Sequence, residues 1–221
     1  MNALRALFAR ELSLAWGRGG GPLLAGAFYL CAATLLPLAV GPEPERLAAV
    51  APGLAWLTLG LAALLSLERL WERDLEDGAL DLLTLGPAPL EGVAVAKCAA
   101  QWLATGAPLA LLTPLVATAF GAPLALAPLT LAAALLGGLA FAFTGGVGAA
   151  LAVGARRGGV LIAVIVLPFF APPVIFGAGA LRAAADGLPW AAHLALLAAY
   201  ALFAVALGPF AMAAAVRNAL D

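Results

Sequence analysis

The residue types that could do chemistry are concentrated in the charged segment, residues 68–81. This segment reads Glu-Arg-Leu-Trp-Glu-Arg-Asp-Leu-Glu-Asp-Gly-Ala-Leu-Asp, in a chain that is 65% hydrophobic and only 10% charged. Apolar runs of membrane-spanning length flank it on both sides, so it must lie at a membrane face rather than in hydrocarbon. The chemistry that this composition favours is ionic and apolar contact with a soluble partner.

The charged segment has an apolar side and a polar side at helical spacing. The candidate partner-binding residues are Leu70, Trp71, Glu72, Asp74, Leu75, Glu76 and Asp77. Leu70, Trp71 and Leu75 would form an apolar anchor, and the acidic residues around it would meet basic groups on the partner. Like charges four residues apart give such a helix little support of its own, which favours an external partner. A solvated helix that extends the preceding span is an equally open interpretation.

The other chemistry-bearing residues do not form a catalytic or metal-binding set. The sequence contains one histidine, His193, and two cysteines, Cys31 and Cys98. A single His cannot build a metal cage, so His193 is expected to be an interfacial or packed residue. The two cysteines fall at different membrane depths, which predicts no disulfide. Gln101 and Thr105 are polar residues of an apolar run and are weak candidates for lining a cavity.

The sequence also lacks a nucleotide-binding motif. The pattern G-x-x-x-x-G-K-[ST] is absent, and the only lysine, Lys97, lies in no glycine loop. We therefore expect no ATP binding by this chain alone, and any nucleotide energy would come from another subunit. The apolar runs carry no ionisable residue at their centres, which disfavours an ion-coupled transporter and intramembrane catalysis.

The elements that position these residues are predicted to be membrane-spanning helices. A mean hydropathy of +1.07 over 221 residues excludes a soluble domain. Apolar runs of about 20 residues can cross a hydrocarbon core of about 30 Å as helices. Six are predicted, at about residues 22–40, 51–67, 95–120, 125–153, 160–181 and 190–215. The predicted fold class is an all-α polytopic membrane protein, with six transmembrane helices in one domain over residues 1–221.

The basic residues predict the orientation of this bundle. With six spans, nine of the eleven fall on one side, namely Arg5, Arg10, Arg18, Arg69, Arg73, Lys97, Arg156, Arg157 and Arg217. Only Arg46 and Arg182 fall on the other side. The positive-inside rule then places both termini in the cytoplasm. Residues 1–21 would form a retained cytoplasmic interfacial helix or merely a cationic leader that sets topology, and residues 68–94 a cytoplasmic coupling segment.

Three further patterns concern the spans and one outward turn. Small residues recur every fourth position in the fourth span, at Ala134, Gly138, Ala142, Gly146, Ala150 and Gly154. This stripe favours close packing, within the subunit or across a dimer. Pro168, Pro172 and Pro173 predict a break in the fifth span. Residues 41–46 predict a stiff turn, in which Glu43 and Glu45 would contact a periplasmic partner or supply only ordinary loop polarity.

The chain resembles the cytochrome c maturation protein B family, also called haem exporter protein B, along nearly its whole length. In the first half, the resemblance is carried by Leu36-Pro37-Leu38, Gly41-Pro42-Glu43-Pro44, Ala51-Pro52-Gly53, Trp56, Leu67-Glu68-Arg69-Leu70 and Asp74-Leu75-Glu76-Asp77-Gly78. In the second half, it is carried by Ala96-Lys97, Trp102, Thr105-Gly106, Pro108-Leu109, Pro114-Leu115, Arg157-Gly158-Gly159-Val160-Leu161, Leu167-Pro168 and Pro209-Phe210-Ala211. The order and spacing of these motifs together are specific.

The resemblance implies a six-helix permease of the ABC-2 type in the bacterial cytoplasmic membrane, in contact with membrane lipid and not with nucleic acid. It would pair with an ABC ATPase, cytochrome c maturation protein A, and with the cytochrome c maturation subunits C and D. ATP hydrolysis by that partner would be coupled to release of haem from a periplasmic haem chaperone. Haem is thus expected only at the level of the complex. Family members often carry His where this chain has Gln101, so no haem-ligand role is assigned to Gln101.

Two other functions stay open alongside this one, and in none of the three is the chain an enzyme by itself. The first is a non-transporting scaffold that holds the ATPase against the haem-handling subunit. The second is an unrelated secondary transporter for a small substrate, which the absence of charges inside the spans disfavours.

Overall fold

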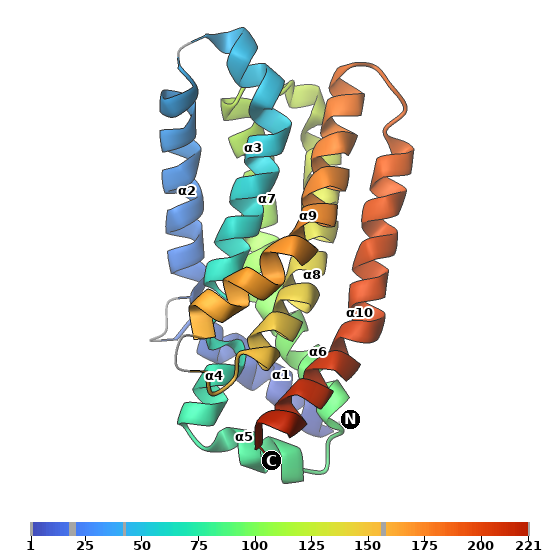
Figure 1. Cartoon of the computed structure of the whole chain (residues 1–221). Helices are drawn as coiled ribbons and strands as arrows, with labels where there is room; N and C mark the ends of the chain where they lie inside the picture. Colours follow the sequence, from blue (N-terminus) through green and yellow to red (C-terminus); the bar gives the residue numbers. More distant parts are fainter. Residues whose placement is uncertain (1, 18–20, 42, 156–157, 221) are drawn as a thin grey trace.

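Helices make up nearly all of the computed structural model, which describes residues 2–17, 21–41, 43–155 and 158–220. Six helical segments within these ranges are long and apolar enough to cross a membrane, which confirms the six predicted spans (Figure 1). The chain is therefore an all-α polytopic membrane protein. Expectations that involve Arg18, Pro42, Arg156 and Arg157 lie outside the described residues.

The elements follow one another with short connections. The helices are α1 (Asn2–Ala15), α2 (Gly21–Val40), α3 (Pro44–Leu65), α4 (Arg69–Glu76), α5 (Ala79–Leu85), α6 (Leu90–Gln101), α7 (Ala107–Ala119), α8 (Ala127–Leu151), α9 (Gly158–Ala185) and α10 (Ala191–Leu220). A π-helical turn, Trp102–Gly106, joins α6 to α7, so these elements form one span, and a 3₁₀ turn, Leu124–Leu126, precedes α8.

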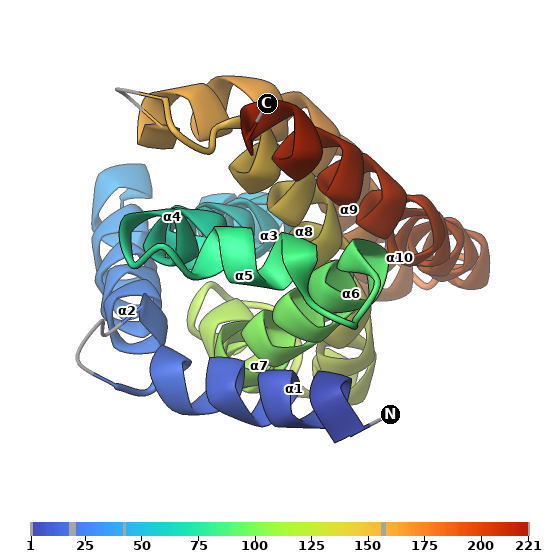
Figure 2. The same ribbon diagram turned by 90° about the horizontal axis from the view of Figure 1, so that it is seen from below.

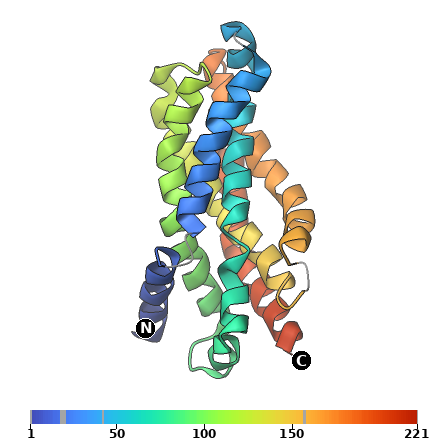
Figure 3. The ribbon, with the colours of Figure 1, turned by 90° about the vertical axis from the view of Figure 1, so that its left-hand side faces the viewer.

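Both ends of the chain lie at the same end of the bundle, together with α4 and α5 (Figure 1). We call this the terminal end, and the end that carries the α2–α3 connection the opposite end. Seen from below, α1 runs along one side of the terminal end beside α6, while α4 and α5 cross its middle (Figure 2). The side view also places α1 outside the bundle of spans (Figure 3). This arrangement agrees with the predicted even number of spans.

Helix α8 is the central element of the bundle. It packs against α3, α4, α6, α7, α9 and α10. The small-residue stripe is buried from Ala134 to Ala150, so it serves packing within the subunit. At Gly146, an added Cβ would lie 2.7 Å from Cys98 Sγ and 2.9 Å from Met212 Sδ, closer than such atoms approach. The stripe thus allows α6 and α10 to approach the backbone of α8.

The indole of Trp56 fixes the packing of α3 on this centre. It is fully buried, and it would collide with a Cβ at either Gly137 on α8 or Gly177 on α9. A large aromatic side chain on one helix therefore fills the space that two glycines leave on its neighbours. Such interlocking contributes much of the attraction between helices in lipid, where there is little hydrophobic driving force.

Helix α9 continues without interruption through its proline cluster, so the predicted break in the fifth span is wrong. The helix bends instead (Figures 1 and 3). Pro173 has no N–H to donate to the carbonyl of Phe169, four residues earlier. The hydroxyl of Tyr200 on α10 donates to that carbonyl oxygen at 2.6 Å. A neighbouring helix thus satisfies a backbone group that the proline leaves free, which lets α9 continue in lipid.

Candidate functional site

The charged segment folds into two short helices that cap the terminal end. Helix α4 ends at Glu76, and after Asp77 the backbone of Gly78 adopts a φ of 68°, a left-handed conformation that suits glycine. This turn starts α5, and Gly86 and Pro87 end it before α6 begins. The predicted helix within the charged segment is therefore present.

The orientation of α4 differs from the expectation. Trp71 is fully buried, and Leu70 and Asp74 are also buried. Leu75 is half-buried, within reach of Gly154. The expectation that Leu70, Trp71 and Leu75 are presented to a partner is wrong, because this apolar side packs onto α6, α8 and the rest of the bundle. Glu72 is likewise half-buried, and one of its carboxylate oxygens accepts a hydrogen bond from Gly154 N at 3.3 Å.

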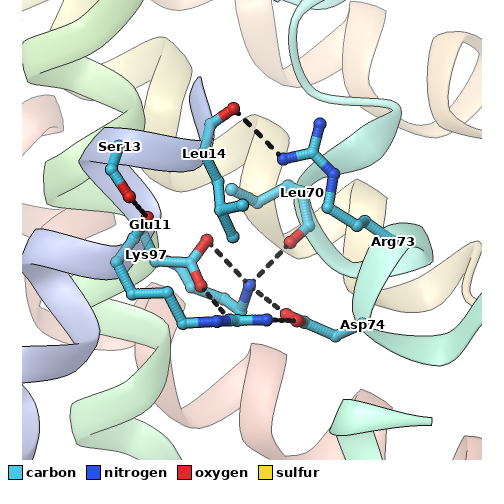
Figure 4. Close-up of polar contacts among 8 residues, drawn as sticks. Glu11, Ser13, Leu14, Leu70, Arg73, Asp74 and Lys97 are labelled. Atoms are coloured by element: carbon cyan, nitrogen blue, oxygen red, sulfur yellow. Dashed lines mark hydrogen bonds and ion pairs between the residues drawn. The ribbon is translucent and has the colours of Figure 1, made fainter. Parts of the chain in front are cut away.

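Four charged side chains form an ion cluster between α1, α4 and α6 (Figure 4). Its members are Arg10, Glu11, Asp74 and Lys97. The Lys97 ammonium of α6 pairs with the Asp74 carboxylate of α4 and lies 3.1 Å from Glu11 Oε2 of α1. Arg10 of α1 bridges the same two acids, with 2.7 Å between Nη1 and Glu11 Oε1 and 2.9 Å between Nη2 and Asp74 Oδ1. Two cations and two anions thus balance one another, and they join three elements.

Lys97 makes further contacts that offset its burial. Its side chain is only 1% exposed. The ammonium donates to Leu70 O at 3.0 Å and lies 5.3 Å from the centre of the Trp71 ring, within the range of a cation–π interaction. A buried ammonium is tolerated only when paired and hydrogen-bonded in this way. The ion cluster therefore fixes α4 on α6.

Arg10 and Arg73 extend the connection between α1 and α4. Partial burial disfavours the charged form of Arg10, but the carboxylates of Asp74 and Glu11 outweigh it and raise the pKa of the guanidinium above its ordinary value. Arg73 donates to the carbonyl oxygen of Leu14, near the end of α1, at 3.3 Å. Sequence reasoning missed this cluster and expected Asp74 to contact a partner protein instead. The one available signal was a single lysine, Lys97, at the start of an apolar run, because a cation there needs an anionic partner.

The exposed surface around the α4–α5 turn and α5 is acidic and apolar. Glu76, Asp77 and Asp81 are exposed around the α4–α5 turn. On α5, Leu82 and Leu85 are 73% and 85% exposed and lie three residues apart, on one side of the helix. Leu80 of the same helix is buried. Of these two helices, α5 and not α4 therefore carries the large exposed apolar side chains.

Gln101 and Thr105, the predicted cavity residues, are brought together beside α3. Gln101 Nε2 lies 2.6 Å from Ser66 Oγ and 3.3 Å from Thr105 Oγ1. Both residues line a small cavity of about 10 Å³ near the π-helical turn. This volume is about that of a single water-sized site, so Thr105 lines no substrate-sized space there. Gln101 joins α6 to Ser66 at the end of α3, and it also lines a larger polar cavity at the terminal end.

Comparison with known proteins decides the family. The chain matches the family described as "CcmB protein" over residues 2–219. The chain belongs to the CcmB family. Proteins named "Heme exporter protein B" are 47% identical in Paracoccus denitrificans, over 97% of this chain and 98% of that protein, and 42% identical in Pseudomonas aeruginosa, over 98% and 97%. In Escherichia coli K12 the identity is 45%, over 88% of each chain.

At the opposite end, this CcmB-family chain presents few polar groups. Glu43 and Arg46 are exposed and form an ion pair with each other at 2.5 Å, and Glu45 is exposed beside them. His193 is half-buried against Gly179 of α9, and its Nδ1 is buried without a hydrogen-bond partner among the described residues. A contact of Glu43 and Glu45 with another protein stays a prediction. Most charged side chains of the described residues in this CcmB-family chain are thus at the terminal end.

Proposed function

We propose that this chain is the membrane component of an ABC-type complex that handles haem, with ATP bound by a partner. The observation that carries this proposal is the match to CcmB over residues 2–219, with relatives named "Heme exporter protein B" at 42–47% identity over nearly their full length. A permease without its own nucleotide motif needs a partner for ATP hydrolysis. In this proposal that partner is cytochrome c maturation protein A, and the maturation subunits C and D and a periplasmic haem chaperone complete the pathway.

In this proposal the chain spans a bacterial inner membrane, and the distribution of basic residues supports a cytoplasmic location for its terminal end. Among the described residues, those at this end are Arg5, Arg10, Arg69, Arg73, Lys97 and Arg217. Arg46 and Arg182 are at the opposite end. By the positive-inside rule, the basic end faces the cytoplasm, where an ATPase would be.

The docking surface in this proposal is the exposed side of α5. Leu82 and Leu85 supply the apolar anchor in place of the buried Trp71, and Glu76, Asp77 and Asp81 add negative charge at the α4–α5 turn and the start of α5. Apolar anchors at the centre of an interface contribute most of its affinity, and the surrounding charges favour a partner of opposite sign. The ATPase would therefore offer an apolar groove bordered by basic side chains.

The ion cluster gives this surface a mechanical connection to the spans. A displacement of α5 passes through the Gly78 turn to α4, and the pairs of Asp74 with Lys97 and Arg10 pass it on to α6 and α1. Because both carboxylate oxygens of Asp74 are engaged, α4 cannot move alone without separating buried charges. Nucleotide-driven movement of the ATPase would thus reach the third span through α6.

Copurification of the ATPase tests the docking surface. The variant Leu82→Ser with Leu85→Ser removes the exposed anchor without touching the buried side of the segment. We expect at least about a tenfold loss of affinity for the ATPase, since two buried leucines contribute several kcal/mol at an interface. The matched control is Leu124→Ser, which replaces a residue that is 74% exposed at the opposite end. Undiminished copurification of the double variant, at normal folded yield, would contradict this surface.

A further inference from the structure

A polar cavity of about 50 Å³ opens at the terminal end where α1, α2, α4 and α6 meet. Its volume is several times the roughly 10–15 Å³ that one water molecule needs. The polar and charged residues that line it are Glu11, Ser66, Arg69, Arg73, Lys97 and Gln101. Three of the six are cations and only one is an anion, so the composition of the wall favours an anionic ligand.

The charge balance around the cavity leaves two arginines uncompensated. Arg10 and Lys97 are neutralised by Glu11 and Asp74 within the ion cluster. Both carboxylate oxygens of Glu11 are held by these cations, so its charge is not free to repel an anion.

Arg69 and Arg73 are two further cations, which the acids of the ion cluster do not neutralise. Arg73 makes one hydrogen bond, to a backbone carbonyl, and Arg69 makes no ion pair or side-chain hydrogen bond with the part of the chain that the structure describes. Two guanidinium groups at one cavity without a carboxylate partner form a receptor suited to a phosphate group, which guanidinium binds through two parallel hydrogen bonds.

The position of the cavity identifies the source of that phosphate. Gly21 and Pro22, at the start of the first span, form part of its wall. The next two residues, Leu23 and Leu24, are 75% and 58% exposed on the lipid-facing side of α2. An anion bound by Arg69 and Arg73 would therefore be at the level of the lipid headgroups, with an apolar helix surface directly beside it for acyl chains.

We infer that this cavity binds the phosphate of an anionic phospholipid, through the guanidinium groups of Arg69 and Arg73. The bound headgroup would lie against Ala15 of α1 and Pro22 of α2, and its phosphate would supply the anionic partner that Arg69 and Arg73 do not have among the described residues. This site requires neither haem nor ATP, so a test of lipid binding does not depend on whether the proposed function is correct.

Native mass spectrometry of the full chain in detergent tests the site, with phosphatidylglycerol as the probe and phosphatidylcholine as the neutral comparison. Arg69→Gln with Arg73→Gln should weaken phosphatidylglycerol binding by about tenfold or more, since each charge-assisted contact is among the stronger hydrogen bonds. Arg69→Gln alone should weaken it by several-fold, and it removes no ion pair or side-chain hydrogen bond made by the described residues, so the folded yield should stay normal. The control is Arg5→Gln, which replaces an exposed cation of α1 at the same end.

The outcomes are distinct. Loss in the Arg69 and Arg73 variants with normal binding in Arg5→Gln supports the site. Equal loss in all three variants would mean general attraction to an anionic surface, and equal binding of phosphatidylcholine would mean apolar contact alone; either would overturn the inference. A last experiment adds inorganic phosphate as a competitor. If millimolar phosphate displaces phosphatidylglycerol completely, the cavity prefers a free anion to a lipid, and the inference is overturned.

Discussion

Lys97 on α6 and Asp74 on α4 form an ion pair in which neither side chain is more than 2% exposed. The two residues belong to different elements, and their contact is what fixes the charged segment on the spans. Because both side chains are almost fully buried, either charge left alone would be far more costly than the pair. This relationship decides which substitutions at the terminal end the fold can tolerate.

Lys97→Met should destabilise the protein by about 3–5 kcal/mol, because it leaves the Asp74 carboxylate buried with only Arg10 as a partner. Denaturation in mixed micelles measures the change in the free energy of unfolding. Lys97→Met combined with Asp74→Leu removes both buried charges and leaves Arg10 paired with Glu11. We expect the double variant to be more stable than Lys97→Met alone. If instead the two effects add, the pair does not behave as a buried unit.

Trp71→Ala should act on the stability of the protein rather than on partner binding alone. Truncation of a fully buried aromatic side chain costs about 3–5 kcal/mol, and here it also removes the ring that the Lys97 ammonium faces. The measurement is the thermal midpoint of the isolated chain, without any partner. A normal midpoint combined with lost copurification of the ATPase would show that Trp71 is available to the partner after all.

Tyr200→Phe should destabilise the protein at the bend of α9. The substitution removes the hydroxyl that donates to Phe169 O and leaves that carbonyl unsatisfied. The expected loss is about 1–3 kcal/mol in the free energy of unfolding. Pro173→Ala restores a backbone N–H that can serve the same carbonyl. In the Pro173→Ala background, Tyr200→Phe should therefore cost much less, and equal costs in both backgrounds would argue against this role.

Cysteine labelling should show Glu45 and Glu76 on opposite sides of the membrane. In a chain with Cys31→Ser and Cys98→Ser, Glu45→Cys should react with a membrane-impermeant maleimide in spheroplasts, while Glu76→Cys should react only after the membrane is opened. Both glutamates are exposed in the structure, so access to the side chain is not limiting. Labelling in the reverse order would invert the proposed orientation.

The sequence was sufficient to predict the spans and their number, because the free energy of placing apolar residues in lipid depends on composition and length alone. The small-residue stripe of α8 was also predicted, although the pattern left open whether it packed within the chain or across a dimer. The structure buries Gly146 against Cys98 and Met212 of this chain. Helical periodicity thus identifies a packing face, while the identity of the neighbour depends on the tertiary arrangement.

The same limit explains the two expectations that were wrong. Periodicity placed Leu70, Trp71 and Leu75 on one side of a helix, but it contains no information on whether that side faces a partner or the chain's own α6 and α8. The predicted break at Pro173 followed from the missing backbone donor, and the replacement comes from Tyr200 on another helix. In both cases the deciding group is distant in sequence, so no local pattern could indicate it.

The ion cluster also constrains how the chain is assembled. Its members belong to α1, α4 and α6, which leave the ribosome in that order. Until Lys97 is made, Arg10 is the only cation of the cluster, and its single charge cannot neutralise both Glu11 and Asp74. The N-terminal helix is therefore among the first segments to be synthesised, yet it can take its final place only after the third span has entered the membrane.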